Sequence, residues 1–146
     1  SVNTIRIITI RINNKTNFIK AFLRIGNNNY VDNTASGGML TIIDLNTGIT
    51  MYDACDGKLN TYKYHPISKE PLKGIKIPYF KEIKDLVVEL SEKEENLKYI
   101  AWDVAVTDNG PVIVEANPYP GYYYQFKIHT PDKIGIIPTF NKILNK

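Results

Sequence analysis

Two Ile-rich segments near the start of the chain constrain its fold most strongly. Residues 4–12 and 18–26 are rich in Ile, Phe, Thr and Leu, and Asn13 and Asn14 lie between them. Because β-branched and aromatic residues favour strands and asparagine favours turns, we predict a β-hairpin. The polar stretch over residues 26–38 is too long for a tight turn and too rich in Gly and Asn for a helix or strand.

The middle of the chain predicts a second hairpin and then irregular structure. Residues 39–44 and 49–53 flank the turn-forming sequence Asn46-Thr47-Gly48, which favours two short paired strands. Residues 54–76 contain scattered prolines and no sustained apolar period, so we predict no helix or strand there.

The second half of the chain alternates between helix and strand patterns. Apolar residues at helical spacing predict a helix that begins at Pro78 and fades near Asn96. Two strands are predicted over 99–107 and 112–117, and a short helix over 138–144. This order predicts an α+β fold, an antiparallel β-sheet with helices packed on one face.

Composition narrows the class of protein. The 146 residues are 43% hydrophobic and 23% charged, which is typical of a globular domain. The net charge of +3 does not indicate a nucleic-acid-binding surface. No apolar run reaches the ~20 residues that span a bilayer. The lone Cys55 excludes an internal disulfide and favours a cytoplasmic setting. The chain begins at Ser1 almost directly in a strand pattern, so we expect it to be part of a longer protein.

Three polar residues lie within the strongly apolar strands of the last predicted hairpin. Asp103 lies on the first strand, and Glu115 and Asn117 share a face of the second with Ile113. A two-residue Asn109-Gly110 turn would pair Asp103 with Ala116, on the wrong face. A three-residue loop over 108–110 sets Asp103 opposite Glu115 and places Gly110 at its left-handed position, so we favour it.

Two opposed carboxylates on a half-buried sheet face predict a cation between them. Without one, carboxylates ~5 Å apart repel each other, and one would take up a proton. Asn117 adds a neutral oxygen, and such hard ligands suit Mg²⁺. The alternative is a hairpin whose polar face is simply solvated.

Arg6 and Arg24 also lie in apolar strands. Arg6 shares its face with Ile8 and Ile10 and needs an anion, because an unpaired buried charge is costly. Either a phosphate or a structural carboxylate would satisfy it. A phosphate-binding Arg6 should have no protein carboxylate in bidentate contact. Arg24 lies closer to a strand end, where it could instead reach water.

The sequence Glu115-Ala-Asn117-Pro-Tyr-Pro120-Gly121, preceded by Asp103, resembles the last hairpin of the ATP-grasp superfamily. The segments Asn3-Thr-Ile-Arg6, Val31-Asp-Asn33 and Gly37-Gly38 resemble its sugar-transfer-associated branch, as do His65-Pro66, Gly74 and Ile77-Pro78. The resemblance covers residues 3–121. It implies that residues 1–146 form the C-terminal part of an ATP-grasp domain, without the ATP-clamping first half, so that this chain alone is an incomplete ATP site.

The resemblance also implies site residues. Asp103, Glu115 and Asn117 are expected to hold two Mg²⁺ ions that bridge the phosphates of ATP. Arg6, with Arg24, is expected to bind the transferred phosphate or acyl phosphate. Further phosphate contacts are expected from the loop residues Asn33, Gly37 and Gly38, although a plain surface loop is the alternative reading of these three.

Other residues are not expected to carry chemistry. His65 and His129 are far apart in sequence and are interpreted as surface residues. Cys55 has no activating neighbour except Lys58, and we interpret it as inert. The run Tyr122-Tyr123-Tyr124 could line an acceptor pocket or pack in a core.

The leading hypothesis is therefore an ATP- and Mg²⁺-dependent ligase. The resemblance implies that it phosphorylates a substrate carboxylate and passes the acyl group to a nucleophile, with small-molecule substrates in polysaccharide or cell-surface sugar biosynthesis. A non-catalytic module that binds a nucleotide or a partner on the same scaffold is the first alternative. A purely structural α+β domain with solvated carboxylates is the second.

Overall fold

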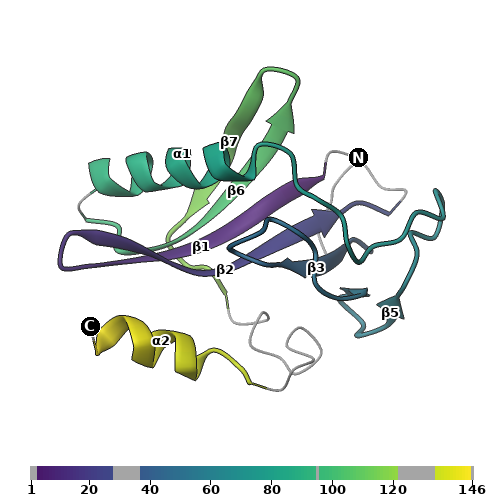
Figure 1. Ribbon diagram of the computed structural model, residues 1–146, viewed down its shortest axis with the longest axis horizontal. Helices are drawn as coiled ribbons and strands as arrows, with labels where there is room; N and C mark the ends of the chain where they lie inside the picture. Colours follow the sequence, from purple (N-terminus) through teal and green to yellow (C-terminus); the bar gives the residue numbers. More distant parts are fainter. Residues whose placement is uncertain (1–2, 28–36, 95, 122–133, 146) are drawn as a thin grey trace.

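Seven antiparallel strands form one sheet in the computed structural model, which describes residues 3–27, 37–94, 96–121 and 134–145 (Figure 1). The spatial order is β5-β4-β3-β2-β1-β6-β7. The elements are β1 (Thr4–Ile12), β2 (Lys15–Ile25), β3 (Met39–Ile43), β4 (Ala54–Asp56), β5 (Thr61–Tyr62), α1 (Phe80–Lys93), β6 (Tyr99–Thr107), β7 (Gly110–Asn117) and α2 (Ile137–Leu144). The predicted α+β class is confirmed.

The first hairpin has the tight turn that its two asparagines predict. Asn13 and Asn14 have φ angles of 50° and 58°, a left-handed pair that matches the twist of the flanking strands. Lys15 pairs with Ile12 directly after the turn, so β2 begins three residues earlier than predicted. Local turn chemistry therefore sets the register of β1 and β2 next to the turn.

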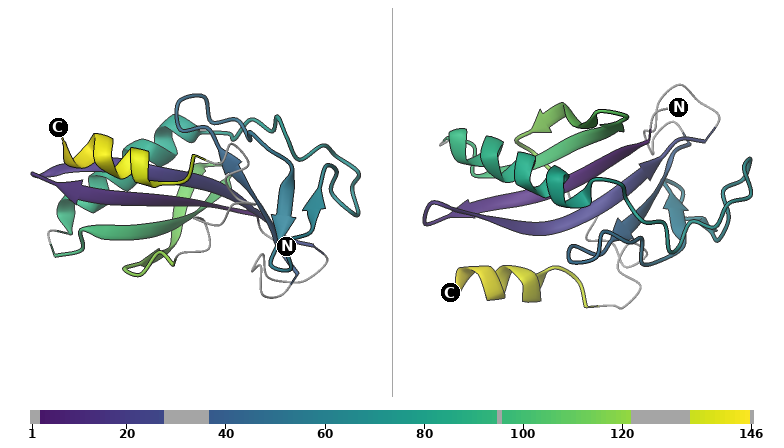
Figure 2. Two further views of the ribbon diagram at one scale, coloured as in Figure 1. Left: turned by 90° about the horizontal axis from the view of Figure 1, so that it is seen from below. Right: turned by 45° about the horizontal axis from the view of Figure 1, so that its top comes forward.

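The sheet is buried on both faces, and each face has its own helix. Ile7 and Trp102 lie on one face in a core that includes Ile83 of α1, and Ile8 lies on the other face in a second core. Phe140 of α2 packs against that second core. Figures 1 and 2 show α1 and α2 on opposite sides of β1 and β2. The prediction of helices on one face only is wrong in this respect, because Ile-rich strands that are apolar on both sides need cover on both.

The predicted second hairpin is present at its turn. Ile43 bridges to Thr50, the Asp44 N–H donates to the Ile49 carbonyl oxygen and the Met51 N–H donates to the Ile42 carbonyl oxygen. The start of β3 pairs instead with β4, through Met39 and Asp56. The segment predicted to be irregular contains β4 and β5. Asp56 organises their connection, since its carboxylate accepts hydrogen bonds from Asn60, Tyr62 and the Lys58 N–H. Burial raises the pKa of Asp56, but these hydrogen bonds outweigh it and the net pKa is lowered.

The clearest predicted helix is shorter than its pattern indicates. α1 begins at Phe80, after Tyr79 in a left-handed conformation, and ends at Lys93. Its buried side chains Phe80, Ile83 and Val87 follow the helical period of the sequence. Within the described ranges, neither α1 nor α2 is long and apolar enough to cross a membrane.

Gly48 lies where α1 meets the turn after β3, and its substitution tests this packing. Its φ angle is 71°, and an added Cβ would lie 2.7 Å from Phe80 Cγ. We expect Gly48→Ala to lower the free energy of unfolding by about 2 kcal/mol or more, because it combines left-handed strain with overpacking. Urea denaturation measures this loss. Gly74→Ala is the control, since Gly74 has a φ of 89° but open space around it, and equal losses in both variants would contradict the packing argument.

Candidate functional site

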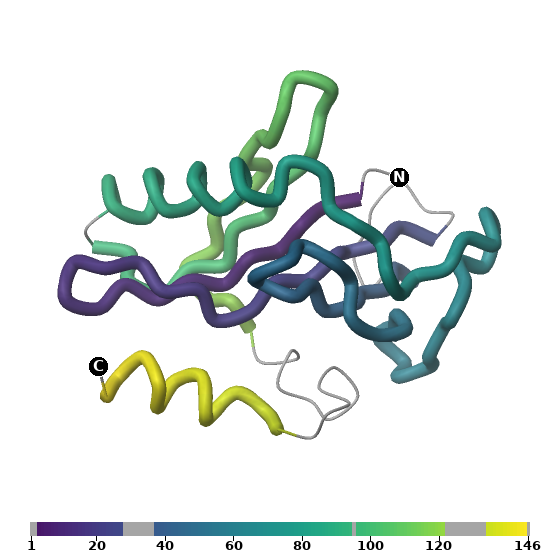
Figure 3. Tube along the Cα trace, viewed as in Figure 1, coloured from purple at the N-terminus to yellow at the C-terminus, as the bar shows by residue number. Residues whose placement is uncertain are grey.

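The last hairpin brings the predicted metal ligands to one face of the sheet. Asp103 pairs directly with Glu115, and Ala101 pairs with Asn117. Directly opposed residues point to the same face, with Cβ atoms ~5 Å apart. Ala101 belongs to the core on the α2 side, so Asp103, Glu115 and Asn117 all lie on that side. Figure 3 traces β6 and β7, in green, from this region to the hairpin tip beyond α1.

The predicted pairing is present, but the predicted loop is wrong. Thr107 pairs with Gly110, which has a φ of 108°, so the loop has two residues. The extra residue lies inside β7 instead, where the register shifts so that Val104 pairs with Ile113 and Asp103 with Glu115. This bulge turns Ile113 to the α1 core, whereas Glu115 lies on the opposite face. A hairpin without it would expose Ile113 or misplace Glu115.

Asp103 lies at the centre of a charge cluster, together with Arg6 and Arg24. Arg6 makes a bidentate contact, with Nε donating to Oδ1 at 2.7 Å and Nη2 donating to Oδ2 at 2.6 Å. Arg24 Nη1 donates to the same Oδ2 at 2.9 Å. Both arginines reach Asp103 because β1 lies between β2 and β6, and Arg6 pairs with Asp103 in the β1–β6 register.

This cluster bears on the two alternatives for the partner of Arg6. The sequence left a phosphate and a structural carboxylate open as partners of Arg6, and a bidentate carboxylate contact was expected only for the second. Asp103, 97 residues further along the chain, makes that contact, which favours the structural partner. The side chains of Arg6, Arg24 and Asp103 are only 13%, 14% and 4% exposed. Two guanidinium groups therefore share the Asp103 carboxylate in a largely buried position.

Glu115 and Asn117 border the cluster on the outer strand. Glu115 is exposed, and Asn117 Oδ1 accepts a hydrogen bond from the Tyr119 N–H at 3.0 Å, which orients the amide. Each oxygen of a carboxylate or amide can accept about two bonds. Asp103 Oδ1 accepts one hydrogen bond within the described residues and Asn117 Oδ1 accepts one, so each retains capacity for a cation.

The donor set fits a hard divalent cation such as Mg²⁺, which takes one or two carboxylates and completes its shell with water or phosphate oxygens. No group of three or more His, Cys, Asp or Glu side chains that could hold a metal occurs in the described ranges. A cation here would therefore depend on the two carboxylates, the Asn117 amide and oxygens from outside the chain.

The predicted phosphate loop is described only in part. Asn33 lies outside the described residues. Gly37, with a φ of 89°, and the buried Gly38 directly precede β3. Leu40 of β3 pairs with Arg24, so the two glycines lie at the strand end beside the charge cluster.

Cys55 has the unreactive environment that the sequence suggested, whereas His65 is partly buried and is not a simple surface residue. Burial, followed by the charge of Asp56, raises the pKa of Cys55 to about 12. His65 Nδ1 accepts a hydrogen bond from the Ser68 N–H, and Nε2 lies 3.0 Å from the Gly26 carbonyl oxygen, so the ring connects two segments. His129 and residues 122–124 lie outside the described residues.

The ion pairs of Arg6 and Arg24 with Asp103 were not predicted from the sequence. The sequence contained one weak indication of them. Each of the three is a charged residue among apolar neighbours in a predicted strand, and buried charges occur in pairs. Their pairing could therefore have been suspected, but strand order was needed to show it.

Comparisons with known proteins give one match. Residues 1–137 match the family model described as sugar-transfer associated ATP-grasp. No curated protein and no solved structure matches the chain.

Proposed function

Because the chain belongs to the sugar-transfer-associated ATP-grasp family, we propose that it supplies the metal- and phosphate-binding part of an ATP-dependent ligase. The observation that carries the proposal is the register of β1, β6 and β7, in which two carboxylates, one amide and two guanidinium groups share one face. The groups that clamp adenine belong, in this proposal, to a part of the protein outside this chain.

Asp103, Glu115 and Asn117 would hold Mg²⁺ in this site. When bound, the metal would neutralise negative charge on the phosphates of ATP. Asp103 has a second task in the proposal, since its bidentate contact orients Arg6 before any ligand binds. Gly37 and Gly38, with Asn33, would add backbone donors to the phosphates.

Arg6 and Arg24 would stabilise negative charge during phosphoryl transfer. A carboxylate oxygen of the substrate attacks the γ-phosphorus of ATP, the bond to ADP breaks, and an acyl phosphate forms. A nucleophile such as an amine then attacks the acyl carbon and inorganic phosphate leaves. Guanidinium groups held close to these oxygens favour the transition state, because they need little reorganisation. The proposed substrates are small molecules. The proposed role is in polysaccharide or cell-surface sugar biosynthesis, and the proposed location is the cytoplasm.

A second candidate is a non-catalytic module that binds a nucleotide or a partner on the same scaffold. The observation that favours it is the pairing of Asp103 with two arginines, which neutralises a metal-binding carboxylate in the absence of ligand. Binding without turnover would distinguish this candidate from the ligase.

Glu115→Gln tests the metal site. Glu115 is exposed, and its carboxylate makes no hydrogen bond or ion pair with another described residue, so the variant should keep its stability. We expect its affinity for Mg²⁺-ATP to fall roughly 10- to 100-fold, as when a metal's coordination is disturbed. Calorimetry with the intact protein measures this, and Glu89→Gln on the exposed face of α1 is the control. Equal affinities for Mg²⁺-ATP in the unchanged protein, Glu115→Gln and Glu89→Gln would contradict the assignment of Glu115 to the metal site.

A further inference from the structure

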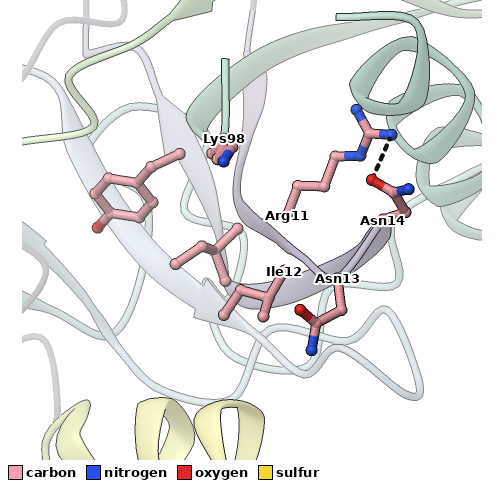
Figure 4. A pocket seen from close by; sticks show the side chains of 7 residues that line it. Arg11, Ile12, Asn13, Asn14 and Lys98 are labelled. Carbon is pink, nitrogen blue, oxygen red and sulfur yellow. Dashed lines mark hydrogen bonds between the residues drawn. The ribbon is translucent and has the colours of Figure 1, made fainter. Parts of the chain in front are cut away.

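A second polar hollow lies at the opposite end of β1 from the charge cluster. β1 continues to Ile12, whereas β6 begins at Tyr99, which pairs with Ile10, so the β1–β6 ladder ends before the last residues of β1. A hollow of about 700 Å³ opens there (Figure 4). Arg6 and Arg11 are five residues apart, roughly 17 Å along a strand, so the two sites are separate.

Among the described residues, the lining of the hollow contains two positive charges and no carboxylate. Arg11 comes from β1 and Lys98 from the segment before β6. The Arg11 N–H donates to the Lys98 carbonyl oxygen at 2.7 Å, which holds the two residues side by side. Two cations from neighbouring segments, with no acidic side chain in the described part of the lining, favour binding of an anion.

The Arg11 guanidinium is incompletely satisfied. Its Nε is buried and has no hydrogen-bond partner among the described residues. Its Nη2 makes one long hydrogen bond, 3.4 Å to Asn14 Oδ1, which is the dashed line in Figure 4. An unsatisfied buried donor costs free energy, and for a charged group the cost is larger. An oxyanion that accepts from this guanidinium would remove that cost.

The rest of the lining indicates the kind of ligand. The Asn13 and Asn14 amides add polar groups at the turn, and Ile10 and Tyr99 belong to the opposite face, where they pack against the core on the α2 side. Figure 4 shows the Arg11 and Asn13 side chains leaving the turn in opposite directions. The groups beside the guanidinium are therefore polar, which suits a small anion.

The sequence explains why one strand serves two sites. Thr4-Ile5-Arg6-Ile7 recurs as Thr9-Ile10-Arg11-Ile12, with an offset of five residues. Because side chains alternate along a strand, an odd offset directs the two arginines to opposite faces. Arg6 lies on the face of Asp103, whereas Arg11 lies on the α1 face and at the far end.

We propose that this hollow binds a small oxyanion, the phosphate or carboxylate group of a ligand, through Arg11 and Lys98. The planar guanidinium matches either group in a bidentate contact, and the ammonium adds a second charge. The site does not depend on the ATP-dependent function, since none of its lining residues belongs to the charge cluster.

Amide chemical shifts of the ¹⁵N-labelled protein test the proposal, with phenyl phosphate and benzoate as probes. We expect saturable shifts at Arg11, Asn14 and Lys98 with at least one probe. Arg11→Gln should weaken that binding about tenfold or more, the loss for one charge-assisted hydrogen bond. Lys98→Gln provides a second variant that leaves the β1–β2 hairpin intact. A preference between the probes identifies phosphate or carboxylate as the bound group.

Lys15→Gln is the matched control, because Lys15 is an exposed cation of the same hairpin and does not line the hollow. Its affinity should remain within about twofold of the unchanged protein. Equal weakening in all variants would reduce the effect to general charge attraction and overturn the proposal. So would the absence of shifts at these amides at millimolar probe. Shifts confined to Arg6, Arg24 and Asp103 would report the nucleotide site alone and would also overturn it.

Discussion

Asp103→Asn is expected to lower the free energy of unfolding by about 3–5 kcal/mol, the usual loss when one partner of a buried ion pair is removed. Asp103 accepts three hydrogen bonds from Arg6 and Arg24, and all three side chains are largely buried. An amide has the same shape, but it has only one acceptor oxygen, and its NH₂ group would face a guanidinium donor. The variant would leave two buried positive charges without their shared carboxylate.

Urea denaturation measures this loss without adding salt, which would screen the charges. Glu115→Gln provides the matched control, since it makes the same chemical change in the carboxylate opposite Asp103 on the neighbouring strand. Glu115 is exposed, so its substitution should change stability by no more than about 0.5 kcal/mol. Small and equal effects in the two variants would show that the cluster does not stabilise the fold.

Arg6→Met is expected to reduce the turnover of ATP by the intact enzyme about 10²-fold or more. This is the scale of losing one donor that stabilises charge in a transition state. The variant should also lose stability, by about 3 kcal/mol, because Arg6 donates two hydrogen bonds to Asp103 whereas Arg24 donates one. Turnover is therefore measured as ADP release per folded molecule, at a temperature where circular dichroism shows the variant to be folded.

Two further variants separate catalysis from architecture at this position. Arg6→Lys keeps the charge but cannot make the bidentate contact, so it should recover little turnover if the geometry of the guanidinium matters. Lys15→Met removes an exposed cation and should leave turnover unchanged. If Arg6→Met lost stability but kept its turnover per folded molecule, Arg6 would be a structural partner of Asp103, and the non-catalytic candidate would be favoured.

Local features of the sequence were sufficient for much of the fold. The two asparagines at positions 13 and 14 adopt the left-handed turn that their residue type favours. The period of apolar residues after Pro78 corresponds to the buried face of α1. Glu115 and Asn117 share a face simply because they are two residues apart in a strand. Each of these results depends on residues close together in the chain, where backbone geometry alone relates them.

The local pattern failed where an insertion or a distant partner decided the outcome. The bulge in β7 turns Ile113 to the α1 core and still sets Glu115 opposite Asp103, a combination that no regular hairpin of this sequence can give. The turn after β3 brings residues 49–51 beside it as predicted, but the pairing of β3 with β4 was not predicted. Both the bulge and this pairing depend on how the whole sheet buries its apolar surface, which no local signal records.

The residue types of the candidate site were determined by the sequence, and their assembly was decided by the tertiary structure. Charged side chains in Ile-rich strands already required partners, since a buried charge without one is costly. Which partner each would have depended on strand order, and β1 lies between β2 and β6 only in the folded sheet. That order places Asp103 beside an arginine 97 residues earlier in the chain, because packing on both faces fixes the register of all three strands.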